Sequence, residues 1–551
     1  MAHSTLPPMH YLTLAQLSVE IAARALSPVD LTEHFLARIA ALDNQLDAFI
    51  TLTADLARQQ ARQAEQEIAR GNYRGPLHGI PFALKDVYET AGIRTTACSK
   101  TLANHVPAAN ATVVQRLMDG GALLLGKLVT HEFASGGPSL DLPWPPARNP
   151  WSTAHFTGGS SSGAGAAVAA GFVPYALGTD TGGSIRIPSA YCGLAGIKPT
   201  YGRVSRKGVI PNSYTFDHCG PMARTAEDCA MVLQVISGHD PRDPTSARRA
   251  VPDFLAQLNA GVRGLRAGLP RHLWEEEAPV AREAQAAFEQ ALEVLRNLGA
   301  PMETVRMRKR QQYNDVRSVI SRSELLSIYD RDLRERPGDF GADFLARNLA
   351  ACMYTAGDVV RAQRERRRMV AEIEPMFAQV DVLLTPAPSP APRLDALLGG
   401  GFADKWENPN LYVPFSLLGL PAMVVCTGYT DEGLPLSMQI VGRPFDEATV
   451  LRVGHAYERA TSWRERRPPL TPGAPKPVLR EPPASTAAAS MDADTRRVLD
   501  TSLARAGYPL NDVQRGMIDR VAPQVLAAAQ RLPRDHGFSD EPASAFHFRE
   551  A

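Results

Sequence analysis

The chain has 551 residues, of which 44% are apolar and 21% are charged, a composition typical of a globular protein with a sizeable core. Its formal net charge of +1 gives no electrostatic reason to expect nucleic acid or an anionic membrane as a partner. The N-terminus lacks the basic and apolar regions of a secretory signal, and no uninterrupted apolar segment approaches the roughly 18 residues of a membrane span. These features favour a cytoplasmic protein.

The cysteines and histidines indicate neither a disulfide framework nor a metal site. The six cysteines are scattered without a Cys-x-x-Cys pair, which is typical of a reducing compartment. Residues 131–135, HEFAS, do not complete the His-Glu-x-x-His pattern of zinc enzymes. We therefore expect no metal and no cofactor.

The N-terminal part of the chain is predicted to be helical. Ser27 is followed by a proline and then, two residues later, by an acid, a pattern typical of a capped helix start. Apolar residues at helical spacing follow between Leu31 and Ile39. Residues 54–70 form a second, mostly polar helical pattern that ends at Gly71.

The middle of the chain alternates short apolar runs with helical patterns. Residues 164–171 and 225–238 are typical of helices. This alternation predicts an α/β fold in which helices cover a sheet. The apolar runs that we expect to form buried strands are residues 80–84, 122–126, 172–178, 382–386 and 422–426.

The composition changes late in the chain. Residues 466–490 are rich in Pro, Ala and Ser and lack periodicity, which predicts an extended linker. Two short helical patterns follow, Thr495–Ala506 and Asn511–Leu532. Because residues 491–551 are too few to build much core of their own, we expect them to pack on something larger. The main domain is expected to span residues 1–465.

Two polar segments in apolar surroundings are candidates for chemistry. Lys85 follows an apolar run; its amino group either reaches solvent or is buried, where desolvation lowers its pKa and makes it a base. Residues 156–171 place glycines and serines before a small-residue helix, which is either an ordinary helix start or a site for a developing anion. Residues 159–163 also fit Gly-x-Ser-x-Gly, but a nucleophile elbow needs a strand before it, and residues 152–158 make a poor one.

The third candidate is the glycine-rich turn GTDTGGSIRIPSA, residues 178–190. Its glycines allow successive backbone N–H groups to point into one hollow, which would hold an oxyanion beside Ser184. Asp180 and Arg186 flank the turn; the alternative is a plain surface turn closed by this ion pair. A serine nucleophile needs a base, and no histidine is obviously placed, so Lys85 acting through a serine of the second segment would serve.

Long motifs in the correct order resemble the amidase signature family. They are GPLHGIPFALKD, GGSSSGAGAAVAAG, GTDTGGSIRIPSAYCGLAGIKPTYGRVS and DEGLPLSMQIVG, and the resemblance extends from about residue 10 to residue 465. It implies a large mixed β-sheet covered by helices on both faces, with a small helical C-terminal extension. It also implies cleavage of carboxamide C–N bonds by a Ser–Ser–Lys triad.

The resemblance assigns a role to each matching residue. Ser184 would be the nucleophile, Ser160 the bridging serine after a cis peptide bond, and Lys85 the base. The supporting residues would be the backbone N–H groups of Thr181, Gly182, Gly183 and Ser184 as the oxyanion hole, the ion pair of Asp180 and Arg186, and the hydroxyl of Ser161 near Lys85.

Three positions depart from the family pattern. Cys98 stands where glycine is common, Ser416 where asparagine is common, and Cys426 where proline is common. None belongs to the triad. The acyl pocket is expected to include residues 131–138 and parts of 310–420. Because the sequence does not give the positions of the side chains in these segments, it does not identify the substrate.

The resemblance implies an amidase that acts on a small carboxamide or a related urea or carbamate, without nucleic acid or a membrane, and often as a homodimer. One alternative is the glutaminase subunit of a tRNA-dependent amidotransferase, in which Arg366 would hold the glutamine carboxylate, although arginine-rich helices are commonly solvated. That alternative needs a kinase-like partner and an ammonia tunnel. Another is a non-catalytic scaffold, which the complete triad disfavours.

The tail, residues 491–551, resembles the small helical subunit of carboxybiuret-hydrolase-type amidases. That subunit is in turn like the C subunit of tRNA-dependent amidotransferases. The alternative is an unrelated helical extension.

Overall fold

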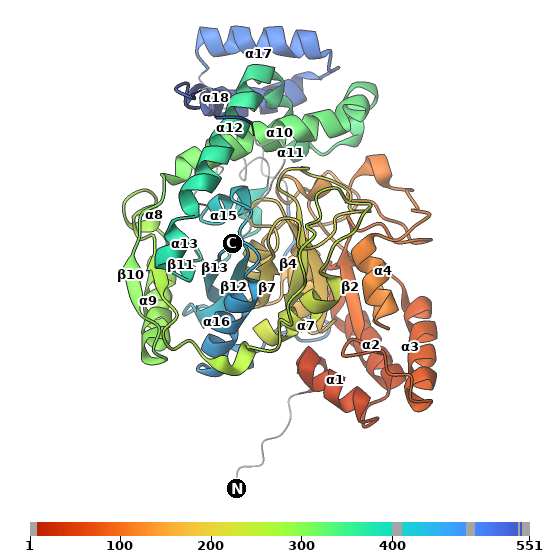
Figure 1. Ribbon diagram of the computed structural model, residues 1–551. Helices are drawn as coiled ribbons and strands as arrows, with labels where there is room; N and C mark the ends of the chain where they lie inside the picture. The colour runs from red at the N-terminus through yellow and green to blue at the C-terminus, as the bar shows by residue number, and fades with distance from the viewer. Residues whose placement is uncertain (1–7, 399–409, 481–490, 538–539, 543–551) are drawn as a thin grey trace.

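A mixed sheet of 11 strands forms the centre of the computed structural model, which describes residues 8–398, 410–480, 491–537 and 540–542 (Figure 1). The strand order is β1-β3-β2-β6-β8-β7-β12-β13-β11-β9-β10. Strand β2 runs parallel to β3 and β6 on either side of it, whereas β8 pairs antiparallel with both β6 and β7. The strands are β1 Phe49–Leu52, β2 Pro81–Lys85, β3 Leu123–Leu128, β6 Tyr175–Asp180, β7 Ala195–Lys198, β8 His218–Ala223, β9 Ala267–Leu269, β10 Met302–Thr304, β11 Val382–Pro386, β12 Ala422–Tyr429 and β13 Pro435–Gly442.

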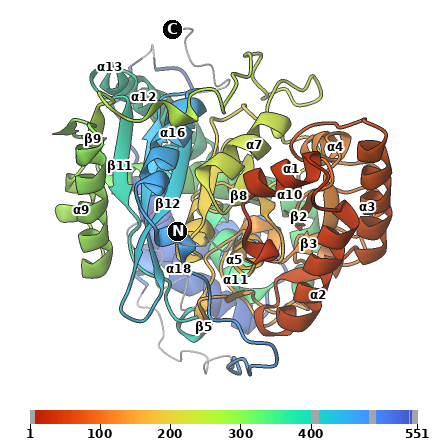
Figure 2. The same cartoon turned by 90° about the horizontal axis from the view of Figure 1, so that it is seen from below.

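Helices cover both faces of this sheet, and Figure 2 shows α7 and α16 in front of the strands. Successive side chains of a strand point to opposite faces. In β12, Met423 and Val425 face Gly454 of α16, whereas Val424 packs beside Ala190 of α6. The helices are α1 Leu14–Ala22, α2 Pro28–Leu46, α3 Ala54–Ala69, α4 Thr112–Asp119, α5 Ser162–Ala169, α6 Arg186–Tyr191, α7 Ala226–Ile236, α8 His272–Glu275, α9 Arg282–Asn297, α10 Arg310–Glu335, α11 Ala342–Asn348, α12 Ala356–Ile373, α13 Met376–Gln379, α15 Val413–Leu417, α16 Glu447–Arg459, α17 Ala493–Ala506 and α18 Asp512–Gln530.

The predicted α/β fold is confirmed, and each of the five apolar runs forms a strand, namely β2, β3, β6, β11 and β12. The predicted helix start is also confirmed: the Ser27 hydroxyl accepts hydrogen bonds from the N–H groups of Val29 and Asp30 at 3.0 and 3.3 Å. Gly71 follows α3 with φ +85°, a conformation that glycine adopts at little cost.

The expectation that residues 152–158 make a poor strand is wrong for most of the segment. Ser152–Phe156 forms β5, which pairs antiparallel with β4, Arg148–Asn149. The hydrogen bonds of this pairing come from outside the segment, so its own weak β propensity does not reveal them.

The C-terminal helices α17 and α18 lie over α10, α11 and α12 (Figure 1). Apolar side chains of the tail, including Leu499 and Ile518, belong to the same core as the sheet. Arg531, just after α18, forms an ion pair of 2.6 Å with Asp315 of α10. Residues 466–480 contain neither helix nor strand, and the rest of the predicted linker, 481–490, lies outside the described residues. No described helix is long and apolar enough to cross a membrane.

Candidate active site

The predicted catalytic residues lie at one edge of the sheet. Lys85 is the last residue of β2 and Asp180 is the last residue of β6. Because these strands are parallel neighbours, their carboxyl ends meet at the same edge, where ligands bind in many α/β proteins. A cavity of about 480 Å³ lies there, and its lining includes Ser160, Thr181, Gly182 and Ser184.

Lys85 is completely buried, and its amino group contacts two hydroxyl groups. Its Nζ lies 2.6 Å from Ser160 Oγ and 2.7 Å from Thr179 Oγ1. The peptide bond between Gly159 and Ser160 is cis. Within the described part of the chain, no carboxylate forms an ion pair with Lys85, so the hydroxyls are its polar environment.

Burial lowers the pKa of Lys85 to about 7, although the negative charges of Asp217 and Asp180 oppose the shift. In a large fraction of the molecules, the Lys85 amine is therefore neutral near pH 7. A neutral amine 2.6 Å from Ser160 Oγ is positioned to accept the hydroxyl proton. Of the two alternatives for Lys85, the structure favours the buried base over the solvated lysine.

Ser161 does not contact Lys85 directly but hydrogen-bonds with the backbone of Thr179, whose hydroxyl contacts Lys85. Its Oγ donates to the backbone oxygen of Thr179 at 3.2 Å and accepts from the backbone N–H of Thr179 at 3.3 Å. These bonds engage the Ser161 hydroxyl, which agrees with discounting a nucleophile elbow at this serine. Sequence reasoning missed the contact of Thr179 with Lys85, although Thr179 lies within the glycine-rich turn that it singled out.

Ser184 lies on the cavity wall just before α6 and is partly exposed there. Its backbone oxygen accepts a hydrogen bond from the N–H of Ser161 at 3.3 Å, which joins the two serine segments. The Ser184 hydroxyl makes no hydrogen bond to any residue that the structure describes. It therefore remains available to a molecule in the cavity.

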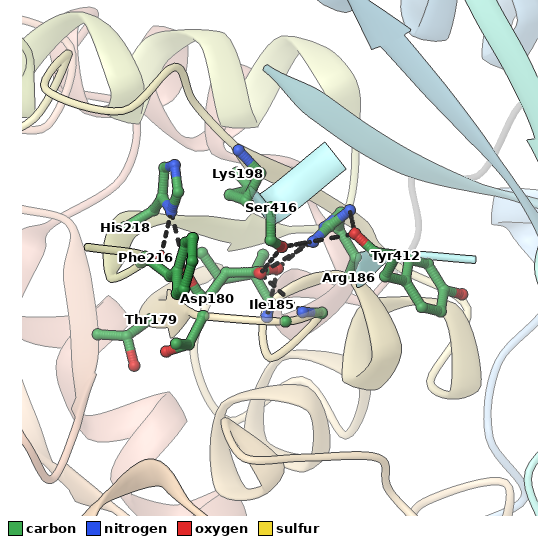
Figure 3. A network of polar contacts seen from close by, with 12 residues as sticks. Thr179, Asp180, Ile185, Arg186, Lys198, Phe216, His218, Tyr412 and Ser416 are labelled. Carbon is green, nitrogen blue, oxygen red and sulfur yellow. Dashed lines mark hydrogen bonds and ion pairs between the residues drawn. The ribbon is translucent and has the colours of Figure 1, made fainter. Parts of the chain in front are cut away.

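A buried ion pair fixes the turn after β6 (Figure 3). Arg186 Nε and Nη2 each lie 2.9 Å from a carboxylate oxygen of Asp180, and both side chains are completely buried. Arg186 also donates to Gln439 Oε1 and Ser416 Oγ at 2.6 Å. Burial alone would raise the pKa of Asp180, but the charge and hydrogen bonds of Arg186 hold it below the usual range. The alternative of a surface turn is therefore excluded.

One backbone group differs from the expected oxyanion hole. The N–H of Gly183 donates to Asp180 Oδ1 at 2.7 Å, so this N–H is not free to bind an oxyanion. Gly183 has φ +122°, a conformation that residues with a side chain rarely adopt. The N–H groups of Thr181, Gly182 and Ser184 have no acceptor among the described residues and remain candidates.

The three departures from the family pattern lie away from the cavity lining that the structure describes. Ser416 joins the buried ion pair, since its hydroxyl accepts from Arg186. Cys98 has φ +51°, the left-handed region that favours glycine, which agrees with glycine being common there. Cys426 lies within β12, and its thiol donates to the backbone oxygen of Gly428 at 3.5 Å.

The cavity wall includes residues of both expected segments, 131–138 and 310–420, and also Asn212, Pro279 and Ala281, which were not expected. His131 Nδ1 contacts the backbone oxygen of Gly136 at 2.7 Å, and burial lowers its pKa to about 4, so it is neutral at pH 7. Arg317 of α10 also lines the cavity, and no sequence pattern distinguishes it from the many arginines nearby. Within the described residues, no group of three His, Cys, Asp or Glu side chains could hold a metal ion.

The Amidase family profile matches residues 30–451. The chain belongs to the amidase signature family. Its mixed sheet with surrounding helices is the fold of solved members, and the chain is an enzyme of the C–N hydrolase type.

Three relatives illustrate the similarity. The A subunit of glutamyl-tRNA(Gln) amidotransferase from Chloroflexus aggregans is 42% identical over 489 residues, which cover 84% of this chain and 99% of the relative. The peptide amidase of Stenotrophomonas maltophilia is 32% identical with a TM-score of 0.73, covering 85% of this chain and all of that one. A chain of a vestigial protein complex that reveals the origins of an s-triazine catabolic enzyme is 32% identical with a TM-score of 0.75, covering 81% of this chain and 98% of that one.

Proposed function

We propose that this protein is an amidohydrolase that cleaves the C–N bond of a small carboxamide, or of a related urea or carbamate, through an acyl-enzyme on Ser184. The observation that carries the proposal is the contact of 2.6 Å between Lys85 Nζ and Ser160 Oγ, buried beside a cavity that Ser184 also lines. A base and a bridging hydroxyl beside an available serine are the parts that a hydroxyl nucleophile needs.

In this mechanism, neutral Lys85 accepts the proton of Ser160 while Ser160 accepts the proton of Ser184. Ser184 Oγ then attacks the carbonyl carbon, and the backbone N–H groups of Thr181, Gly182 and Ser184 donate to the oxyanion. As the intermediate collapses and the C–N bond breaks, the relay returns a proton to the leaving nitrogen, which departs as ammonia or an amine. Water, deprotonated through the same relay, hydrolyses the acyl-enzyme and frees Ser184.

Ser184→Ala tests this assignment. We expect the variant to fold normally and to lose activity by at least about 10³-fold, because the attacking oxygen is gone. A fluorophosphonate probe should label the wild-type protein at Ser184 and should leave the variant unlabelled. Ser152→Ala, a serine of β5 outside the cavity lining, is the control and should keep both activity and labelling. A fully active Ser184→Ala enzyme would overturn the proposal, and labelling of Ser184 would exclude the non-catalytic scaffold.

The second candidate is a glutaminase subunit that supplies ammonia to a tRNA-dependent amidotransferase. It is favoured by the 42% identity to a protein named as the A subunit of glutamyl-tRNA(Gln) amidotransferase. The interpretation of Arg366 as its carboxylate ligand loses support, because Arg366 is buried, donates to the backbone oxygen of Leu417 and lies over the Phe216 ring, outside the described cavity lining. Such a subunit would need other subunits and tRNA as partners, contrary to the expected absence of nucleic acid.

Ammonia release by the purified chain separates the two candidates. A free-standing amidase should hydrolyse small amides, ureas or carbamates without any partner protein. A glutaminase subunit should instead prefer glutamine and should be inactive or weakly active until a partner is added. The interpretation of the tail as a fused small subunit stays a prediction, which truncation of residues 491–551 would test. The homodimer also stays a prediction, which sedimentation would test.

A further inference from the structure

Asp217 is a buried carboxylate that lies beside the nucleophile turn without a cation in contact. It directly precedes β8, whose first residue, His218, pairs with Asp180 at the end of β6. Asp217 is only 7% exposed. Within the described part of the chain its carboxylate accepts hydrogen bonds but forms no ion pair. A buried charge of this kind is costly for the folded protein, so its presence beside the site calls for a role.

Three hydrogen bonds fix the Asp217 carboxylate. Its Oδ1 accepts from the Thr181 hydroxyl at 2.6 Å, and its Oδ2 accepts from the backbone N–H groups of Asn212 and Ser213 at 2.8 and 2.9 Å. Burial raises the pKa of Asp217, but these donors oppose the rise. Thr181 carries one of the candidate N–H groups of the oxyanion hole, and Asn212 lines the cavity. The carboxylate therefore joins the nucleophile turn to the cavity wall.

Lys85 is the second buried group here without an ion pair, and it lies close to Asp217. Lys85 Nζ contacts the hydroxyl of Thr179, and Asp217 contacts the hydroxyl of Thr181, two residues further along the same segment. Of the negative charges that act on Lys85, Asp217 has the largest effect. The base and this carboxylate are thus opposite in charge when Lys85 is protonated, but they do not touch.

The other carboxylates near Lys85 have cations in contact. Asp180, which has the next largest effect on Lys85, is paired with Arg186 at 2.9 Å. Asp86, the next residue in the chain, is paired with Lys127 at 3.0 Å. An opposite charge in contact cancels much of the field that a carboxylate exerts on a more distant group.

The remaining titratable groups that interact with Lys85 are neutral over the pH range of interest. Burial raises the pKa of the Cys219 thiol to about 12 and raises that of Cys98 further. His131, whose pKa burial lowers to about 4, is likewise uncharged at neutral pH. Asp217 is therefore the main charge without a contacting partner that acts on the base.

We propose that Asp217 is a positioning residue of the reaction, which holds Thr181 at the oxyanion site and stabilises the ammonium group that Lys85 becomes when it accepts a proton. The inference rests on the proposed function and adds a residue to it. Lys85 Nζ takes the Ser160 proton, Ser160 takes that of Ser184, and Ser184 Oγ bonds to the carbonyl carbon, so a positive charge appears in a buried place. A carboxylate that is already oriented lowers the cost of this charge. When the C–N bond breaks, the ammonium returns the proton through Ser160 to the leaving nitrogen.

The pH profile of Ser184 labelling by a fluorophosphonate probe tests the role of the charge. In the wild type the labelling rate should rise with pH through about 7, because the neutral amine is the active form. Asp217→Asn removes the charge but keeps the hydrogen bonds, since its amide oxygen can accept the two backbone N–H groups and its NH2 group can donate to the Thr181 hydroxyl. The ammonium is then less favoured and the pKa of Lys85 falls. The midpoint should move to lower pH by about one pH unit, and the plateau rate should fall by about tenfold because the base is weaker.

Asp243→Asn is the matched control. Asp243 is also buried, and it too accepts from two backbone N–H groups, those of Arg206 and Thr245, and from one hydroxyl, that of Thr245. It lies outside the described cavity lining, so its variant should keep both the midpoint and the plateau. Asp217→Glu keeps the charge but displaces the hydrogen bonds. Its plateau should therefore fall while its midpoint stays at the wild-type value.

The midpoint separates a charge effect from a structural one. A structural contact changes the amount or the geometry of active enzyme and leaves the proton affinity of Lys85 unchanged. A midpoint that Asp217→Asn does not move, or that Asp243→Asn moves equally, would therefore overturn the role of the charge. An unchanged plateau in Asp217→Glu would overturn the hold on Thr181.

Two further outcomes complete the test. If Asp217→Asn fails to fold, Asp217→Ser, which removes the charge and leaves room for water, decides by the same midpoint. Absence of Ser184 labelling in the wild type at every pH would refute the proposed function itself. Labelling that rises through about pH 7 in the wild type, with no change of midpoint in the Asp217 variants, would refute only this inference.

Discussion

Lys85 and Lys127 lie on the neighbouring parallel strands β2 and β3 and are both completely buried, yet their partners differ. Lys127 Nζ lies 3.0 Å from Asp86 Oδ1 and also donates to Thr95 Oγ1 at 2.7 Å. Lys85 contacts the hydroxyls of Ser160 and Thr179 instead. Burial lowers the pKa of both lysines, but at Lys127 the charge and hydrogen bond of Asp86 oppose the shift.

Under the proposed mechanism, this difference in partners lets one sheet hold a structural lysine and a base side by side. A counter-charge beside a buried lysine opposes the loss of the proton that burial favours. A buried lysine that contacts only hydroxyls loses its proton near pH 7 and becomes available for proton transfer. Both lysines are buried, so the difference between them lies in the groups that their amino groups contact: a carboxylate at Lys127 and hydroxyls at Lys85.

The largest expected effect follows the loss of the base. Lys85→Met keeps a long, flexible side chain in the same space, and we expect kcat/KM to fall by about 10³- to 10⁴-fold because no group remains to accept the Ser160 proton. The melting temperature should not fall sharply, since the change removes a buried amine that has no counter-charge. Amide hydrolysis and thermal unfolding measure the two properties. Activity within tenfold of wild type would show that Lys85 is not the base.

Lys127→Met should give the opposite pattern. It leaves Asp86 buried without its cation, so the free energy of unfolding should fall by about 3–5 kcal/mol while the folded fraction keeps its kcat. Urea denaturation at pH 7 measures the loss. Adding Asp86→Asn, which removes the stranded charge but keeps an acceptor for Thr96, should recover part of the stability. If Lys127→Met is as stable as wild type, the ion pair with Asp86 does not explain why Lys127 and Lys85 differ.

Much of the fold could be predicted from local sequence. The buried strands are apolar runs, and the Ser27 cap depends on residues that are neighbours in the chain. Strand β5 could not be predicted, because its pairing with β4 supplies what local propensity lacks. The order of the strands depends on contacts between distant segments, which the periodicity of a single segment does not encode.

The candidate site also contains residues that the sequence motifs identify and contacts that they do not. Lys85, Ser160 and Ser184 lie in long motifs, so the sequence selects them, although their catalytic roles remain proposals. The contact of Arg317 with Gly182 joins α10 to the turn after β6, and nothing in either segment indicates the other. The engagement of the Gly183 N–H was missed because it depends on the Asp180 side chain folding back over its own turn.

The smallest expected effect follows a substitution beside Lys85 that leaves the lysine itself in place. In the wild-type enzyme kcat/KM should rise with pH through about 7, since the neutral amine is the active form. Thr179 Oγ1 accepts a hydrogen bond from Lys85 Nζ, which favours the protonated amine. Thr179→Val removes this acceptor, so the pKa of Lys85 should fall further and the midpoint should move to lower pH by about one unit.

The matched control is Thr95→Val, which removes the corresponding hydroxyl from Lys127. Because Lys127 keeps its carboxylate and transfers no proton in the reaction, the midpoint of the pH profile should stay at its wild-type value. Profiles of kcat/KM from about pH 5 to about pH 9 measure both variants. A midpoint that Thr179→Val leaves unchanged, or that both variants shift equally, would mean that the hydroxyl partners do not set the proton affinity of Lys85. The contrast between the two lysines would then need another cause.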